Sequence, residues 1–227
     1  MLNNMSQPEI IPVIAIDGPS ASGKGTIAQR VAKALGYHYL DSGALYRLVA
    51  LAAKNRNISW QDEKALALMA AKLEIKFQGE QILLNGQDVS DEVRSEEMGK
   101  GASQVAVHPA VRTALLDLQH SFRQAPGLVA DGRDMATIVF PDAMTKIYLT
   151  ASAEVRAERR YKQLIQKGKH ASLPDILHDL QQRDARDSQR SAAPLQQCKD
   201  ARLLETSQLA IEEAVSFVLN VVSEHLK

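Results

Sequence analysis

The segment from Gly18 to Thr26 carries residue types that bind phosphate. It reads Gly-Pro-Ser-Ala-Ser-Gly-Lys-Gly-Thr, so small residues and glycines surround a single lysine. Small residues let the backbone curl until successive N–H groups point at one phosphate, with a helix N-terminus behind them. Lys24 adds a compact charge that can reach the β and γ oxygens of a triphosphate. Glycines also favour a plain strand-to-helix turn, but the spacing, the lysine and both flanking elements together predict a nucleotide-binding loop.

The whole segment is expected to line the nucleotide. In the usual pattern of such loops Ser or Thr follows the lysine directly, whereas here Gly25 intervenes before Thr26. Thr26 could still serve the shell of a magnesium ion through water, so the direct metal ligand stays open. The expected contacts of ATP are Gly18, Pro19, Ser20, Ala21, Ser22, Gly23, Lys24, Gly25 and Thr26.

The elements around this loop predict an α/β fold. Residues 10–16 form a short apolar run rich in β-branched residues, which is typical of a fully buried parallel strand. After the loop, Ile27, Val31 and Leu35 recur along one helix face, and Gly36 sits where the helix would stop. Strands alternating with helices imply a parallel sheet covered on both faces. Further strands are expected at Leu128 to Asp131, Lys146 to Thr150 and Arg202 to Glu205, with a final helix capped by Thr206 or Ser207.

Two segments interrupt this alternation. Residues 73–77, residues 81–85 and the piece after Asn85-Gly86 resemble short strands joined by tight turns, because Asn-Gly favours hairpins. They predict a small inserted β subdomain. Residues 156–190 carry nine basic and five acidic side chains, a net charge of +4, on an arm that contains Gly168 and Pro174.

Composition disfavours two classes of partner. The chain has 227 residues with 27 basic and 27 acidic side chains, so it has no net field to hold a polyanion, and its ten aromatic residues are few for base stacking. Nucleic acid is therefore not expected. The apolar run at residues 10–16 is too short to span a bilayer, so no membrane partner is expected. The lone Cys198 fits a reducing compartment, and we expect a cytoplasmic protein.

Several motifs together resemble one family. A Gly-Lys-Gly-Thr ending of the loop is common in nucleoside monophosphate kinases, and the further motifs resemble bacterial-type cytidylate kinases from about residue 12 to the final helix. Each piece alone is weak, but the combination is specific. Ala21 and Ser22 stand where many members have Gly and Ala, which affects only loop detail. The motifs are Ile16-Asp-Gly-Pro-Ser20, Leu40-Asp-Ser-Gly-Ala-Leu-Tyr-Arg47, Ala102-Ser-Gln-Val-Ala106, Ala130-Asp-Gly-Arg-Asp134 and Arg183-Asp-Ala-Arg-Asp-Ser-Gln-Arg190.

The resemblance implies a fold and a reaction. The reaction would be reversible transfer of the γ-phosphoryl group of ATP to CMP, and also to dCMP, with magnesium. The fold would have a P-loop core of residues 10–41, 106–155 and 196–227, and an acceptor-binding region of residues 42–105 with the β insert at about residues 73–90. Residues 156–195 would form a helical lid, and the protein would be a monomer.

An acceptor monophosphate needs cations rather than a base. Its second pKa is about 6, so its oxygen is already a nucleophile at neutral pH. Positive groups must surround the two repelling phosphates and hold them in line, and none of the six histidines needs to take part. The residues expected to assist the transfer are Lys24, Arg133, Arg160, Arg183 and Arg190.

The resemblance also implies an acceptor site. Ser42 and Arg47 would hold the acceptor phosphate with Arg133, which follows a strand at the edge where α/β sheets bind ligands. Cytosine offers an amino donor beside acceptor atoms, so Asp134 and Ser103 would bind the amino group and Arg112 the acceptor edge. Two plainer interpretations stay open. Ser42 could simply cap a helix, and Asp134 could form an ordinary ion pair with Arg112.

Further candidate residues lie in the lid and at a possible metal site. By resemblance Arg156 would lie against adenine, Arg160 and Arg190 would contact phosphates, and Arg183 with Asp187 would reach the acceptor phosphate and ribose. Spacing alone favours a solvated face with Arg183 and Asp187 paired. Asp131 ends a strand and could orient water on magnesium, or it could be a buried aspartate that only shapes the turn.

Two other functions stay open from the sequence. The loop and the lid alone do not name the acceptor, so a kinase of another small molecule is one alternative. The other is a slow nucleotide-dependent switch, which would need no acceptor pocket. The presence of Arg47, Arg112, Arg133 and Asp134 argues against a switch.

Overall fold

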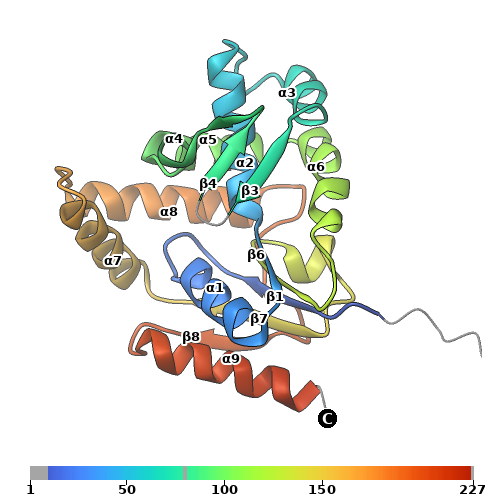
Figure 1. The fold of residues 1–227 in the computed structure, drawn as a ribbon. Coiled ribbons are helices and arrows are strands. Elements are labelled where there is room, and N and C mark those ends of the chain that lie inside the picture. The colour runs from blue at the N-terminus through green and yellow to red at the C-terminus, as the bar shows by residue number, and fades with distance from the viewer. Residues whose placement is uncertain (1–9, 79–80, 226–227) are drawn as a thin grey trace, which may run out of the picture.

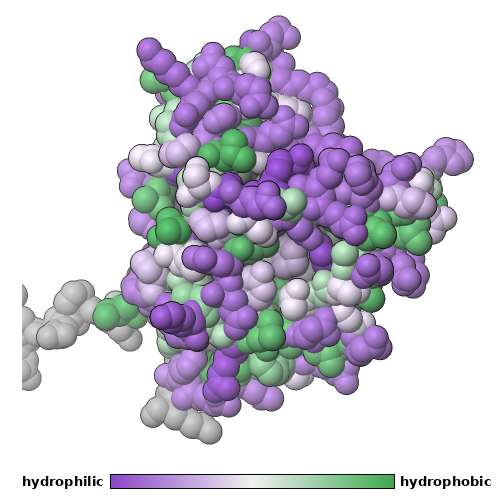
Figure 2. All heavy atoms as spheres, turned by 180° about the vertical axis from the view of Figure 1, so that it is seen from behind, coloured by the Kyte–Doolittle hydropathy of each residue, from purple (hydrophilic) through white to green (hydrophobic). Residues whose placement is uncertain are grey.

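The computed structural model of the chain describes residues 10–78 and 81–225. Residues 79 and 80 of the expected insert and residues 226 and 227 of the expected core lie outside the described residues. Within the described ranges, no helix combines the length and the apolar character that crossing a membrane requires. The face shown in Figure 2 is mostly hydrophilic, with scattered hydrophobic side chains.

A five-stranded parallel sheet forms the centre of the molecule, in the order β2-β6-β1-β7-β8 (Figure 1). The middle strand is buried along its whole length, as its continuous apolar run predicts. The predicted α/β fold with a parallel sheet is confirmed. Its strands are β1 (Val13–Asp17), β2 (His38–Asp41), β6 (Leu128–Gly132), β7 (Thr145–Thr150) and β8 (Arg202–Glu205).

Helices cover both faces of this sheet because side chains alternate along each strand. Ile14 and Ile16 pack on one face with α1 (Lys24–Leu35) and α9 (Ile211–His225). Val13 and Ala15 belong to a second apolar cluster, on the other face, to which the remaining central helices contribute. These are α2 (Ser42–Asn55), α3 (Glu63–Ala70), α5 (Glu96–Val105), α6 (Pro109–Ser121) and the π-helical turn η1 (Met135–Val139).

The predicted β insert forms a small antiparallel sheet at one end of the molecule (Figure 1). Its strands are β3 (Ile75–Gln78), β4 (Gln81–Leu84) and β5 (Gln87–Asp88), and the short helix α4 (Ser90–Val93) follows. Asn85 and Gly86 join the last two strands with φ values of 50° and 82°. Both angles are left-handed, as a two-residue hairpin turn requires.

The predicted arm is a pair of helices, α7 (Ala153–Gln166) and α8 (Leu173–Gln189), which pack against each other. Ser152 and Ser172 cap them, and Gly168 adopts a φ of 70° in the turn between them. Helix α8 also contacts α5 of the region opposite. The arm therefore lies beside α5 (Figure 1).

The start of the last helix differs from the sequence expectation. Helix α9 begins at Ile211, and neither Thr206 nor Ser207 caps it. The Thr206 hydroxyl donates to the Thr150 carbonyl oxygen at 3.0 Å, and the Ser207 hydroxyl donates to the Glu205 carboxylate at 2.5 Å. Both side chains thus stabilise the end of β8 instead.

Candidate active site

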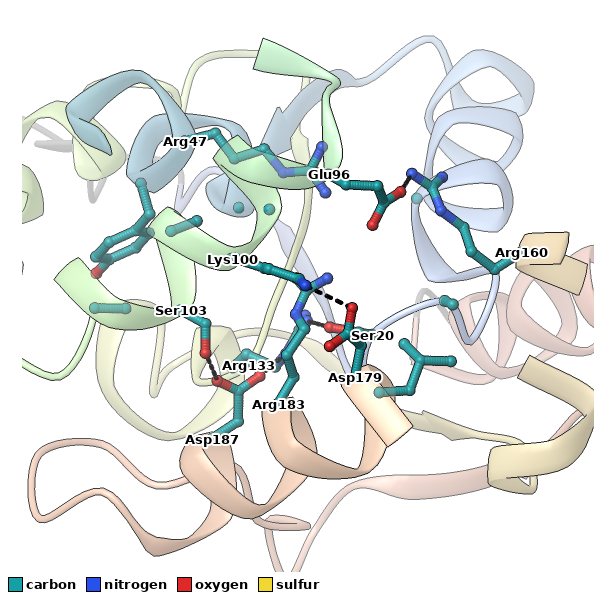
Figure 3. Close-up of a pocket in the computed structure, with 18 of the residues that line it drawn as sticks. Ser20, Arg47, Glu96, Lys100, Ser103, Arg133, Arg160, Asp179, Arg183 and Asp187 are labelled. Atoms are coloured by element: carbon teal, nitrogen blue, oxygen red, sulfur yellow. Dashed lines mark hydrogen bonds and ion pairs between the residues drawn. The ribbon is translucent and has the colours of Figure 1, made fainter. Parts of the chain in front are cut away.

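A cavity of about 430 Å³ opens at the carboxyl end of the parallel sheet, between the phosphate loop, α2, α5 and the arm (Figure 3). Open α/β sheets bind ligands at this edge. Among the residues selected from the sequence, those lining it are Ser20, Ala21, Lys24, Gly25, Ser42, Arg47, Ser103, Arg112, Asp131, Arg133, Asp134, Arg160, Arg183, Asp187 and Arg190. Those outside its lining are Gly18, Pro19, Ser22, Gly23, Thr26 and Arg156.

The first residue of the phosphate loop, Gly18, packs closely against strand β7. A Cβ on Gly18 would lie 2.0 Å from the Leu149 carbonyl oxygen of β7, so only glycine fits there. Ala21 and Gly23 adopt φ values of 58° and 92°, and left-handed residues among ordinary ones make the N–H groups of a loop converge on an anion. The loop thus has the backbone shape that its composition predicts.

Lys24 is the first residue of α1 and lies almost buried, with 9% of its surface exposed. Its Nζ donates to the Pro19 carbonyl oxygen across the loop at 3.2 Å. Burial, followed by the neighbouring guanidinium of Arg133, lowers the pKa of Lys24 to about 7. A phosphate in the loop would favour the charged ammonium, because an opposite charge stabilises it.

Asp131 lies beside the lysine at the end of β6. Burial and then the neighbouring Asp41 raise the pKa of Asp131 to about 7. Its Oδ2 accepts a hydrogen bond from the Tyr39 hydroxyl at 2.6 Å. Thr26 is exposed on α1, away from the cavity lining. The described residues contain no group of three or more His, Cys, Asp or Glu side chains that could hold a metal ion.

Ser42 begins α2, but it does not cap the helix. The cap is Asp41, whose carboxylate accepts from the Ala44 N–H at 3.0 Å, so the interpretation of Ser42 as a plain cap is wrong. The Ser42 hydroxyl instead donates to Gln119 Oε1 at 2.8 Å. Arg47, one turn further on, donates to the Val93 carbonyl oxygen at 3.3 Å, and burial lowers its pKa.

Arg112 and Asp134 form an ion pair at one end of the cavity. Asp134 is buried, and burial raises its pKa although Arg112 opposes the shift. The Arg112 guanidinium also stacks 5.5 Å from the ring centre of Tyr46. The ion-pair interpretation is confirmed as a contact, and it places a carboxylate and a guanidinium side by side, as recognition of a base edge requires.

Ser103 lies near Asp187 rather than making a hydrogen bond with Asp134. Its Oγ donates to Asp187 Oδ1 at 3.3 Å and accepts from Arg186 Nε at 3.3 Å. Figure 3 shows Ser103 on α5 facing Asp187 on α8. This contact connects the acceptor region to the arm.

Arg133 connects three elements that meet at the cavity. Its Nε donates to Asp187 Oδ2 at 2.9 Å, and its Nη2 donates to Ser20 Oγ in the phosphate loop at 2.7 Å. Asp187 is buried. The interpretation of a solvated Arg183 and Asp187 pair is therefore wrong, since Asp187 faces inward and its partner is Arg133.

Arg183 and Arg190 bring positive charge to the cavity, and each has one buried nitrogen that makes no hydrogen bond within the described structure. Within the described part of the chain, Arg183 Nε and Arg190 Nη2 are buried and have no hydrogen-bond partner. Burial, followed by Arg133 and Arg47, lowers the pKa of Arg183 to about 10. Arg190 Nη2 lies 3.9 Å from the Asp134 carboxylate, and its Nε donates to the Ala193 carbonyl oxygen at 2.6 Å. Such a cluster is suited to bind an anion.

Arg156 lies behind the phosphate loop. It is 5% exposed, and its three nitrogens contact the Ala151 carbonyl oxygen at 2.9 Å, the Ser20 carbonyl oxygen at 3.1 Å and the Asp184 carboxylate at 2.7 Å. All of its donor groups are thus engaged on protein atoms. The contact with adenine that the resemblance implies stays a prediction.

Two ion pairs join the arm to α5 across the cavity. Arg160 pairs with Glu96, and Lys100 pairs with Asp179 at 2.7 Å (Figure 3). Arg160 lines the cavity and faces the Glu96 carboxylate, and the phosphate contact that the resemblance implies for it stays a prediction.

Sequence reasoning missed several residues of this site. Tyr39, Gln119 and Arg159 contact site residues that lie 92, 77 and 137 positions away in the chain. The only signal for Tyr39 was its place directly before the Leu40-Asp41-Ser42 motif, within strand β2, which was itself not predicted. Arg159 could have been suspected from its place between Arg156 and Arg160. Nothing in the sequence pointed to Gln119.

Comparison with known proteins agrees with this geometry. The cytidylate kinase family model matches residues 14–224. The chain is 60% identical over 210 residues to the cytidylate kinase of Polynucleobacter asymbioticus, covering 92% of this chain and 96% of the relative. It is 57% identical over 217 residues to that of Nitrosomonas europaea, covering 96% and 97%.

A solved structure supports the fold alone. An uncharacterized protein from Eubacterium ventriosum superposes with a TM-score of 0.52 at 12% identity, covering 94% of this chain and 98% of the other. The family assignment therefore rests on the sequence matches, which extend over nearly the whole chain. With the loop, the arginine cluster and the buried acidic residues in one cavity, these matches show that the chain belongs to the cytidylate kinase family.

Proposed function

We propose that this protein transfers the γ-phosphoryl group of ATP to CMP, producing CDP and ADP, and that dCMP is also an acceptor. The relatives named above are cytidylate kinases. The observation that carries the proposal is the single cavity in which a phosphate loop faces a group of arginines and a buried Asp134. A donor and an acceptor could be held there together.

The phosphate loop would hold the triphosphate of ATP. Backbone N–H groups from Gly18 to Thr26 and the start of α1 would surround the β-phosphate, as at other helix N-termini. Lys24 would pair with the phosphate oxygens and shield their charge from the attacking group. In this role the low pKa of Lys24 would rise when the anion binds.

The opposite side of the cavity would hold CMP. Arg47, Arg133 and Ser42 would bind its phosphate, and the Ser42 hydroxyl would first have to leave Gln119 in order to donate to an oxygen. Asp134 would accept from the cytosine amino group, while Arg112 would donate to the acceptor edge. A uracil carbonyl facing Asp134 would be repelled, which gives selectivity for cytosine.

The transfer itself would depend on charge stabilisation. The dianionic acceptor phosphate needs no general base, so the protein's part is to align the two phosphates and to neutralise the charge that spreads over the transferred group. Among the described residues, Arg183 Nε and Arg190 Nη2 make no hydrogen bond, although Arg190 Nη2 forms a 3.9 Å ion pair with Asp134, so both could donate to the transferred group. Arg160 would join them after leaving Glu96. Asp187 would orient Arg133 and reach the ribose.

A magnesium ion fits the donor set at the end of β6. Magnesium usually keeps several waters and binds through one or two carboxylates together with substrate phosphates, and Asp131 is a carboxylate that lines the cavity with Lys24 of the phosphate loop. Asp131 would hold the ion through water, and Thr26 would assist from α1. When bound, the ion would supply neutralisation of phosphate charge.

The arm would act as a lid. We propose that residues 156–195 close over the donor and exclude water, that residues 42–105 bind the acceptor, and that the remaining residues form the core. The protein would work as a monomer in the cytoplasm, without nucleic acid or a membrane.

An acceptor panel tests the proposal. ADP release from ATP would be measured with CMP, dCMP, UMP and AMP, each in the presence and absence of magnesium. We expect turnover with CMP and dCMP, much lower turnover with UMP and AMP, and none without a divalent ion. A kinase of another acceptor would respond to none of the cytidine nucleotides, and a nucleotide-dependent switch would respond to no acceptor at all.

A further inference from the structure

Two arginines of α7 hold the outer side of the phosphate loop. Arg156 Nη1 donates to the Ser20 carbonyl oxygen at 3.1 Å, and Arg159 Nη1 donates to the Ser22 carbonyl oxygen at 3.4 Å. Residues three apart on a helix share a face, so one face of α7 contacts alternate peptide units of the loop.

Arg159 is itself fixed by the end of the sheet. Its Nη1 donates to Thr206 Oγ1 at 3.2 Å, and its Nη2 donates to the Thr206 carbonyl oxygen at 2.5 Å. Thr206 is buried, and its hydroxyl donates to the Thr150 carbonyl oxygen at 3.0 Å while lying 3.5 Å from the Ser22 carbonyl oxygen. Since Thr150 ends β7 and Thr206 follows β8, the position of Ser22 is tied to two strands.

Holding a carbonyl also orients an amide. In a trans peptide the C=O of one residue and the N–H of the next point in opposite directions. The bonds to the Ser20 and Ser22 carbonyl oxygens therefore direct the N–H groups of Ala21 and Gly23 away from α7. Ala21 has a φ of 58°, which residues other than glycine seldom adopt unless the surroundings hold them there.

We propose that Arg159 is a positioning residue for the phosphoryl donor. Together with Arg156 it fixes the peptide units that aim the Ala21 and Gly23 amides at the phosphates of ATP, and it does so without touching the nucleotide. The donor's identity rests on the proposed function. Because α7 belongs to the arm, the same contacts make the shape of the phosphate loop depend on where this helix lies.

Donor binding in the absence of an acceptor provides the test. Arg159→Gln should weaken ADP binding, measured by calorimetry, by about tenfold, as expected for loss of hydrogen bonds from a charged group. The KM for ATP should rise by a similar factor, while the KM for CMP changes by less than about twofold. Thr206→Val, which removes only the hydroxyl, should weaken ADP binding in the same direction but less. Glu158→Gln, the neighbouring exposed residue of α7, is the matched control.

The NMR chemical shift of the Gly23 amide provides a second measurement. It should not change if Arg159 only contributes to the overall stability of the protein. We expect the Gly23 shift on ADP binding to be reduced in Arg159→Gln and retained in Glu158→Gln. The proposal would be overturned if Arg159→Gln had the same ADP affinity and the same Gly23 shift on ADP binding as the unaltered protein. It would also be overturned if the variant lost affinity for both substrates equally and had a lowered unfolding temperature. If the unaltered protein binds ADP but phosphorylates no cytidine nucleotide, the proposed function fails while the ADP and Gly23 measurements still decide the role of Arg159.

Discussion

The two sides of the cavity are prepared for anions in different ways. On the proposed donor side, Arg156 and Arg159 hold peptide groups of the phosphate loop by donating to the Ser20 and Ser22 carbonyl oxygens, and Arg133 donates to the Ser20 hydroxyl. On the proposed acceptor side, Arg183 lies close to Arg133 and Arg47, and its buried Nε makes no hydrogen bond within the described structure. Arg190 lies close to Arg112, and its Nη2 makes no hydrogen bond and only a 3.9 Å ion pair with Asp134. The loop peptides on the donor side are thus held in place before binding, whereas the acceptor side has buried guanidinium nitrogens that make no hydrogen bond within the described structure.

This difference indicates that the two sides of the cavity contribute differently to ligand binding and to stability. A preformed backbone site loses little entropy when a ligand arrives, which favours tight and unselective binding of phosphate. A cluster of like charges destabilises the folded protein until an anion enters, so binding there should order and stabilise the arm. Substitutions on the two sides should therefore differ in their effects on activity and on stability.

Lys24→Met should give the largest effect. It removes the only ammonium of the donor loop, and loss of a group that stabilises transition-state charge costs roughly a thousandfold in kcat. CMP binding, measured by calorimetry, should change little because Lys24 belongs to the other side. Lys33→Met, at the exposed end of the same helix, is the control. A comparable loss in that control would show that the helix, not the charge, was affected.

Arg183→Gln should lower kcat by roughly a hundredfold for the same electrostatic reason. Its unfolding temperature without nucleotides should nevertheless rise, by about 2 °C, because a buried charge beside Arg133 and Arg47 has been removed. Thermal unfolding with and without CMP measures this. A fall in the unfolding temperature would contradict the idea that the acceptor side is electrostatically strained. Lys167→Gln, exposed at the end of α7, should change neither quantity.

Asp134→Ala should raise the KM for CMP by about tenfold to a hundredfold, since it removes a buried acceptor and leaves Arg112 without its partner. The KM for ATP should stay nearly constant. Steady-state kinetics with each substrate varied in turn separate the two. Equal increases in both constants would indicate misfolding, and Asp142→Asn, an exposed partner of Arg123, controls for loss of a carboxylate.

The smallest effect concerns pH. Burial lowers the pKa of Lys24 to about 7, so the charged ammonium is progressively lost as pH rises from 6 to 8. ATP should then bind with proton uptake, and its dissociation constant should increase over that range by at most about tenfold per pH unit. Calorimetry in two buffers of different ionisation enthalpy measures the uptake. A pH-independent affinity, or proton uptake that persists in Lys24→Met, would contradict this origin.

The sequence predicted the donor side better than the acceptor side for a physical reason. The loop is local, because its strand, turn and helix are consecutive, and Gly18, Gly23 and Lys24 carry a pattern that one segment suffices to recognise. Strands β1, β6, β7 and β8 of the sheet and the β insert were likewise predicted from short apolar runs and from Asn85-Gly86. The resemblance supplied the acceptor residues, which the structure gathers in one cavity.

What the sequence could not provide are contacts between distant segments. Strand β2 was missed because it lies at the edge of the sheet, where only Leu40 is buried and no continuous apolar run forms. The choice of Asp41 over Ser42 as the cap depends on which side chain reaches the Ala44 N–H. The prediction that Asp187 pairs with Arg183 was wrong. Helix spacing favours that pair, whereas Asp187 lies on the inward face of α8 and accepts a hydrogen bond from Arg133.

The close approach of Gly18 to the Leu149 carbonyl oxygen limits how this protein can change over evolutionary time. No side chain can enter there unless β1 and β7 move apart, and those neighbouring strands carry the rest of the sheet. Substitutions of Gly18 should therefore not be tolerated. Ala21, three residues later, has a backbone that glycine would adopt with less strain, so variation in the loop should accumulate there and leave its first residue untouched.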